Sequence, residues 1–132
     1  MSKHITILAL LAALAAGASA ADLVVIGHPS AAALTKEQVA DIFLGKNLSM
    51  TPVDQAEAAP IRAEFYKLVT GRDTAQVKAV WSRLVFSGKA QPPKELPDSA
   101  AVKKAVAADP KVVGYIEKTA VDASVKVITP ID

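Results

Sequence analysis

The chain has 132 residues, a formal net charge of +2 and no cysteine. Such a near-neutral balance lacks the basic surface typical of nucleic-acid binders, so we expect no nucleic-acid partner. Without cysteine no disulfide forms, and burial and hydrogen bonding must stabilise the fold. The length suits one compact domain.

Residues 1–20 are typical of a secretory signal peptide. Lys3 and His4 give a short basic start, Ile5 to Gly17 is apolar, and Ala18-Ser19-Ala20 is a small-x-small cleavage signal. A membrane anchor is the alternative, but the apolar run is too short to span a bilayer. We therefore predict cleavage after Ala20 and a single domain at 21–132. We expect this product to be soluble in the periplasm and not membrane-embedded, and we expect no lipoprotein because the processing site lacks a cysteine.

The first half of the predicted domain alternates strand and helix. The unbroken aliphatic run Leu23–Ile26 predicts a strand covered on both faces, as in a parallel sheet. A capping box at Thr35–Gln38 starts a helix that Gly45 ends. Met50–Val53 is the predicted second strand. A helix from Pro60 to about Thr70 follows.

The second half begins with the clearest helical pattern in the chain. Asp73 or Thr74 caps this helix, Gly88 ends it, and its apolar stripe is Val77, Val80, Trp81, Leu84 and Val85. Three prolines between Gly88 and Asp98 predict an irregular surface segment. The remaining predicted elements are a helix over 98–108 and strands at Val112–Ile116 and Val125–Ile128. This order predicts a single α/β domain.

The helix that starts at Pro60 is the most informative feature for function. Proline suits the first helical position, and the N–H groups of Ile61 to Ala63 should point into the preceding loop. A helix N-terminus of this kind favours anions. The polar residues around it, Asp54, Gln55, Glu57 and Arg62, favour binding over catalysis.

A second loop should contribute to the same site. Ligands of open α/β sheets bind at the carboxyl ends of strands, where the segment Gly27–Ser30 also lies. We therefore expect His28, Ser30, Gln55 and Arg62 to converge on one anion. Two alternatives stay open: Arg62 is a solvated charge, and His28 is a turn residue that hydrogen-bonds a neighbouring loop.

The two carboxylates near this helix constrain the ligand. Glu57 would repel an anion unless the ligand carries a proton to donate, as hydrogen phosphate does, and this argues against sulfate. Asp54 has the alternative role of accepting hydrogen bonds from backbone N–H groups.

Other residue types give little sign of chemistry. The chain has no G-x-S-x-G, no cysteine nucleophile and no phosphate-cradling glycine loop, so we expect no enzyme activity and no cofactor. No second ligand lies at metal spacing from His28, so we expect no metal site. Trp81 and Phe65 should be core residues, while Tyr66 and Tyr115 are expected to be partly exposed.

Three segments together resemble the phosphate-binding proteins of ABC transporters. Leu34–Lys46 resembles the family's L-s-x-x-x-x-x-I-F-x-G segment, and Val112–Ile116 resembles its a-I-G-Y strand. Gln55–Tyr66 lies where the family has its phosphate-binding loop and following helix. The match is closest to short, single-domain members, which also share His28-Pro29-Ser30 and the stretch Trp81–Glu95. The resemblance implies a single periplasmic-binding-protein-like lobe, with a mixed sheet of about four to five strands flanked by about four helices.

The resemblance also implies a ligand, phosphate or a related oxyanion, and a set of binding positions. The family's loop resembles R-x-D-G-S-G-T-x-x-x-F. With Phe65 as the anchor, its arginine falls on Gln55, its aspartate on Glu57, its serine on Ala59 and its threonine on Ile61. Both hydroxyl donors and the arginine are therefore replaced, and we expect weak binding.

The size of this chain, compared with that of the family's two-lobed members, determines which partners the resemblance implies. Two-lobed members close around phosphate, whereas this chain has room for one lobe. A periplasmic solute-binding protein that engages an ABC permease is the first hypothesis. The alternative is a non-transport interaction or sensory lobe that docks on an envelope partner, and a homodimer would restore a second wall.

Overall fold

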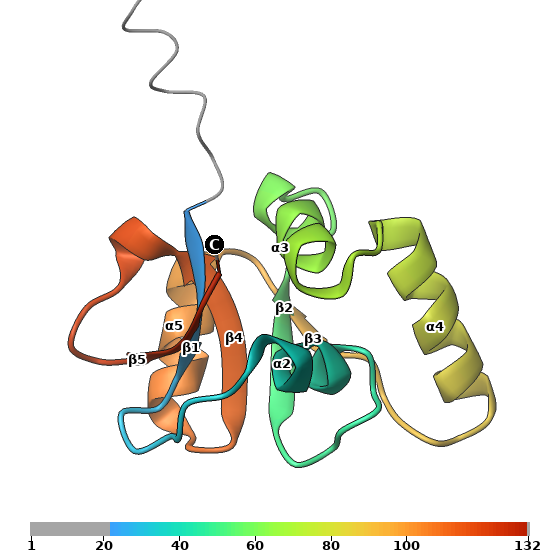
Figure 1. Cartoon of the computed structure of the whole chain (residues 1–132), viewed down its shortest axis with the longest axis horizontal. Coiled ribbons are helices and arrows are strands. Elements are labelled where there is room, and N and C mark those ends of the chain that lie inside the picture. The colour runs from blue at the N-terminus through green and yellow to red at the C-terminus, as the bar shows by residue number, and fades with distance from the viewer. Residues whose placement is uncertain (1–21, 132) are drawn as a thin grey trace, which may run out of the picture.

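The structure is a computed structural model and describes residues 22–131 (Figure 1). The predicted signal peptide at 1–20 lies outside the described residues. The strands are β1 (Leu23–Gly27), β2 (Thr51–Gln55), β3 (Lys94–Leu96), β4 (Val112–Glu117) and β5 (Lys126–Pro130). The helices are α2 (Lys36–Phe43), α3 (Pro60–Thr70), α4 (Thr74–Phe86), α5 (Ser99–Ala108) and the short 3₁₀ helix η2 (Lys118–Ala120).

The five strands form one mixed sheet in the order β3-β2-β4-β1-β5. Strand β2 runs parallel to β3 and β4, whereas β1 runs antiparallel to β4 and β5. The predicted α/β lobe with a mixed sheet is confirmed. The prediction of parallel neighbours for β1 is wrong: its five residues are all buried because helices cover both faces of the sheet, whichever way its neighbours run.

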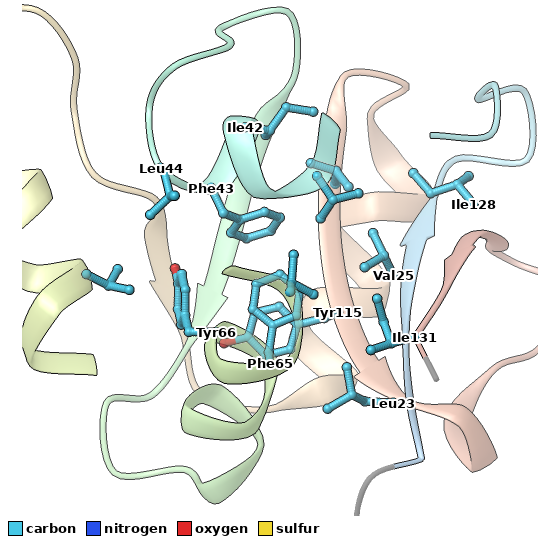
Figure 2. Packing of buried hydrophobic residues seen from close by; sticks show 14 of the residues in the cluster. Leu23, Val25, Ile42, Phe43, Leu44, Phe65, Tyr66, Tyr115, Ile128 and Ile131 are labelled. Carbon is cyan, nitrogen blue, oxygen red and sulfur yellow. The ribbon is translucent and has the colours of Figure 1, made fainter. Parts of the chain in front are cut away.

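Helices cover the sheet unequally on its two faces (Figure 1). On one face α5 packs Val102 and Val106 against β1, β2 and β4. On the other face α2 and α3 enclose an aromatic cluster, which Figure 2 shows between these helices and the sheet. Within it the Phe65 ring stacks on Tyr115 with centroids 4.0 Å apart, and Phe43 meets Phe65 edge-on at 4.7 Å. Helix α4 lies farthest from the sheet, at the side of the molecule.

Local signals in the sequence set the helix ends. Thr35 and Asp73 form capping boxes at the starts of α2 and α4, as predicted for Thr35 and as one of two options at Asp73. Helix α3 begins at Pro60 and ends before Gly71, whose φ of 71° suits glycine. These bounds match the sequence prediction for α3.

Two sequence predictions fail around β2. The strand runs on to Gln55 instead of ending at Val53, so both Asp54 and Gln55 are strand residues that are only 2% exposed. The segment predicted to be irregular contains the short edge strand β3, whose backbone pairs Glu95 with Asp54. Prolines 92 and 93 precede β3 instead of interrupting it, and an edge position tolerates them.

Within residues 22–131, no helix combines the length and apolar character that crossing a bilayer would need.

Candidate functional site

The end of β2 carries a buried carboxylate whose partners come from α3, from β4 and from β2 itself. Asp54 accepts a hydrogen bond from the Tyr66 hydroxyl on α3 at 2.6 Å, another from the Tyr115 hydroxyl on β4, and one from the Gln55 N–H at 2.9 Å. The Arg62 Nε lies 3.7 Å from the same carboxylate. Several hydrogen bonds and a counter-charge are what a buried carboxylate needs to remain in a fold.

The two tyrosines are structural partners of Asp54. Both were expected to be partly exposed, yet Tyr66 is 1% and Tyr115 is 0% exposed, so that prediction is wrong. Burial, and then the negative charge of Asp54, raise the pKa of the Tyr66 and Tyr115 hydroxyls well above the usual tyrosine value. Both hydroxyls therefore stay protonated and act as donors over the physiological pH range.

Arg62 belongs to the same network. Its Nη1 donates to the Gln55 carbonyl and to Glu95 Oε2, both at 2.9 Å. The Arg62 side chain is only 18% exposed, so it is not a solvated surface charge. Burial lowers the pKa of its guanidinium, but Asp54 and Glu95 outweigh this effect and raise the pKa overall.

His28 and Ser30 lie at the opposite edge of the sheet from Gln55 and Arg62. Gly27 at the end of β1 pairs with Val113, which in turn pairs with Pro52 near the start of β2. The carboxyl ends of β1 and β2 therefore point in opposite directions, and the expected convergence on one anion is wrong. The His28 Nδ1 instead lies 2.8 Å from the Ser30 hydroxyl within its own turn.

The N-terminus of α3 opens into a cavity of about 640 Å³, here called the α3–α5 pocket. The end of β2, the first turns of α3 and α5, the start of β1 and the end of β4 surround it. Its lining residues are Asp22, Gln55, Ala59, Pro60, Ile61, Glu64, Pro97, Asp98, Ser99, Ala100, Glu117 and Thr119. Three of the sequence-predicted site residues therefore come together here: Gln55, Ala59 and Ile61.

The two helices whose N-termini border this pocket are capped differently. At α5 the Asp98 side chain caps the helix by accepting from the Ala101 N–H at 2.9 Å. At α3 the N-cap is Ala59, which makes no side-chain cap bond in the described structure. The Arg62 N–H donates to the Ala59 carbonyl at 3.0 Å, whereas the N–H of Ile61, which lines the pocket, has no hydrogen-bond partner among residues 22–131. The positive end of the α3 dipole therefore faces the cavity without a side-chain cap.

The charged side chains that line the α3–α5 pocket are all acidic. Among the described residues its charged lining consists of four carboxylates: Asp22, Glu64, Asp98 and Glu117. Both N–H groups of the Gln55 side-chain amide already have partners in the protein, because Nε2 donates to Ser99 Oγ at 3.0 Å and to the Tyr115 carbonyl at 2.9 Å. Since Ser99 Oγ accepts there, its own hydroxyl proton remains a donor.

Three further predicted site residues, Asp54, Glu57 and Arg62, line a second cavity of about 490 Å³, here called the α4 groove. Glu57 is exposed and pairs with Lys78 on α4 at 3.2 Å. The groove is lined by Asp54, Glu57, Arg62, Tyr66, Val77, Lys78, Trp81, Ser82, Val85, Phe86, Pro92, Pro93 and Glu95. The polar residues around Pro60 are therefore divided between two cavities.

Sequence reasoning missed four residues of these networks: Tyr66, Tyr115, Glu95 and Ser99. Tyr66 follows Arg62 by four positions, which places the two side chains on one helix face. Tyr115 lies two residues after Val113 on β4, so both side chains lie on the face of the sheet that carries the aromatic cluster. The contribution of Glu95 has no comparable local signal, because it depends on the pairing of β3 with β2.

For metal binding, residues 22–131 hold no group of three or more histidine or acidic side chains placed around a common point.

The arrangement of one mixed sheet between helices, with a helix N-terminus open at its edge, defines a single lobe of the periplasmic-binding-protein type. No protein-family model matches the chain, and no curated protein matches it either. Solved structures do match. A protein assigned as a phosphate ABC transporter substrate-binding protein, solved with bound phosphate, from Clostridium perfringens superposes with a TM-score of 0.65 and 21% identity.

Two further structures agree with this result. An ABC-type phosphate transport receptor from Vibrio cholerae gives a TM-score of 0.62 at 18% identity, and PstS from Borrelia burgdorferi gives 0.59 at 12%. Between 81% and 82% of this chain is covered, against 44% to 46% of each of the three solved proteins. The resemblance seen in the sequence is confirmed for the fold, and the chain spans less than half the length of these proteins.

Proposed function

We propose that this lobe binds phosphate or a related oxyanion weakly at the N-terminus of α3, as a periplasmic solute-binding protein. The observation that carries the proposal is the uncapped start of α3 at Ala59 and Pro60, which opens into the α3–α5 pocket. The bound phosphate in the Clostridium perfringens protein of the same fold supports this ligand class.

The chemistry of the pocket selects among oxyanions. The Ile61 N–H and the Ser99 hydroxyl are the proposed donors, with the dipoles of α3 and α5 adding positive potential. The four carboxylates of the pocket oppose a fully ionised anion. Hydrogen phosphate can donate its proton to one of them, whereas sulfate has no proton at neutral pH. We therefore expect phosphate to bind more tightly than sulfate.

The predicted site residues take different parts in this proposal. Gln55, Ala59 and Ile61 contact or border the ligand. Asp54 and Arg62 do not contact the ligand in this proposal. They hold the end of β2 and the first turn of α3 in place. Glu57 lies at the α4 groove, where it pairs with Lys78.

The experiment is a phosphate titration followed by backbone amide shifts. The Ile61 and Ser99 amides should shift at millimolar phosphate and less with sulfate. Ala59→Asp places a carboxylate cap on the same amides, so it should stabilise the protein by about 0.5–2 kcal/mol while abolishing the phosphate shifts.

Ala58→Asp is the matched control, since Ala58 is exposed and does not line the pocket. It adds the same charge one residue away and should keep most of the binding. Unmoved amides at millimolar phosphate, or undiminished binding by Ala59→Asp, would refute the proposal.

A second candidate is a non-transport interaction or sensory lobe that docks on an envelope partner. One observation favours it: Phe86 beside the α4 groove is 95% exposed. An ABC permease is the partner under the first candidate, and another envelope protein is the partner under the second. Affinity capture from envelope extracts followed by identification of the retained protein distinguishes them.

A further inference from the structure

Helix α4 carries more apolar surface than its own lobe covers. The sequence predicts one buried stripe along this helix, and the first part of it is buried, with Val77 4% and Trp81 7% exposed. Leu84 of the stripe is still partly buried against the core, but the last residue of the stripe, Val85, is 43% exposed, and Phe86, which follows outside the stripe, is 95% exposed. The predicted burial of Val85 is therefore wrong for a single copy of the chain. Figure 1 shows α4 at the side of the molecule, farthest from the sheet.

The α4 groove lies directly beside this exposed turn. Val77, Trp81, Pro92 and Pro93 supply apolar walls, and Phe86 itself belongs to the lining. The volume of about 490 Å³ exceeds what one phenyl group needs. One surface thus combines a protruding aromatic side chain with a cavity able to receive such a side chain.

Charges of both signs border the same surface. Lys78 and Glu57 form an ion pair whose side chains are 72% and 61% exposed. Glu95 is 52% exposed and bonds Arg62 through Oε2. A patch with a protrusion, a cavity and both signs of charge can match a copy of itself, which is the requirement for a two-fold symmetric interface.

We propose that two copies of this chain associate through the α4 groove, with Phe86 of each copy inserted into the groove of the other. Exchange of Phe86 covers the exposed end of α4 and places one phenyl ring in each groove. The Lys78–Glu57 pairs then lie at the rim, where exposed charges influence orientation and association rate more than affinity. This association is independent of oxyanion binding, because the groove and the α3–α5 pocket have no lining residue in common.

Sedimentation velocity of the purified protein from micromolar to millimolar concentration tests the proposal. We expect a concentration-dependent dimer, and Phe86→Ser should weaken it by about tenfold or more, as for a central aromatic interface residue. Leu48→Ser is the matched control: Leu48 is also largely exposed, at 67%, but does not line the groove. This control should leave the dimer unchanged.

Trp81 gives a direct report on the groove, because it is the only tryptophan in the chain and lines the cavity. Its fluorescence should become less accessible to acrylamide as the dimer forms, and Phe86→Ser should remove this change. Phosphate-induced amide shifts should persist in Phe86→Ser, which separates failure of one proposal from failure of the other.

Three results would overturn the proposed dimer. They are a monomer at millimolar concentration, a dimer that Phe86→Ser leaves intact, and a dimer that Leu48→Ser disrupts equally. Because Phe86 is exposed, Phe86→Ser should fold normally, and circular dichroism checks that the variant retains its helices.

Discussion

Asp54 and Gln55 are consecutive residues of β2 whose side chains lie on opposite faces of the sheet, here called the α3 face and the α5 face. Strand alternation directs their side chains to opposite faces of the sheet. Asp54 faces α3, where two tyrosine hydroxyls and Arg62 surround it. Gln55 faces α5, where it donates to Ser99 and to a backbone carbonyl. Each face thus receives one buried polar group from the same strand end.

The difference between the two residues lies in charge. Asp54 is a buried carboxylate that depends on donors from three elements, whereas Gln55 is neutral and needs two acceptors. Removing a buried charge from its partners costs more than removing a neutral hydrogen-bonding group. The α3 face should therefore be the more sensitive of the two, and three experiments test this comparison in descending order of expected effect.

The largest effect should follow from Asp54→Leu. It keeps approximate side-chain shape but leaves two buried tyrosine hydroxyls without their acceptor and Arg62 with only Glu95 as a charged partner. We expect a loss of about 3–5 kcal/mol in the free energy of unfolding, measured by urea denaturation.

Asp41→Leu is the control for that measurement, since Asp41 is exposed on α2. Its effect should stay within about 0.5 kcal/mol. A loss below about 1 kcal/mol for Asp54→Leu would mean that the α3 face does not depend on its buried carboxylate.

An intermediate effect should appear at alkaline pH. The pKa values of Tyr66 and Tyr115 are raised in the folded state, so above the unfolded value of about 10 the unfolded chain releases protons that the folded chain keeps. Stability is complete below that pH and falls above it, by about 1.4 kcal/mol per pH unit for each tyrosine.

Phenolate absorbance gives the readout, because these are the only two tyrosines in the chain. Both should ionise together with unfolding, and Tyr66→Phe should reduce the pH slope by about half. Ionisation of either tyrosine near pH 10 in a protein that remains folded would contradict the buried network.

The smallest effect should come from Gln55→Met on the opposite face. Methionine matches the length of glutamine but donates no hydrogen bond, so Ser99 Oγ and the Tyr115 carbonyl each lose a donor. We expect a loss of about 1–2 kcal/mol in the free energy of unfolding. A cost equal to that of Asp54→Leu would remove the distinction between the faces.

Much of the fold follows from local sequence signals. The capping boxes at Thr35 and Asp73, Pro60 at the first position of α3, and Gly71 after its end each act within a few residues, so the helix bounds could be predicted. Strand direction has no such local signal. The aliphatic run of β1 shows that both faces are covered, but it does not show which way its neighbours run.

That gap explains the main error about the site. The prediction that His28 and Arg62 converge assumed parallel strands, and the antiparallel β1 places them at opposite edges. The prediction that Tyr66 and Tyr115 are partly exposed failed because a tyrosine next to a buried carboxylate gains a hydrogen bond that offsets the burial of its hydroxyl.

By itself the sequence determined the helices, their ends, the α/β class and the resemblance to phosphate-binding lobes, because these depend on periodicity, capping and short motifs. Only the tertiary structure decided that Arg62 contacts both Asp54 and Glu95, and that the residues around Pro60 are divided between two cavities. Those features depend on strand order and register. They bring together residues far apart in the chain, and no local pattern encodes them.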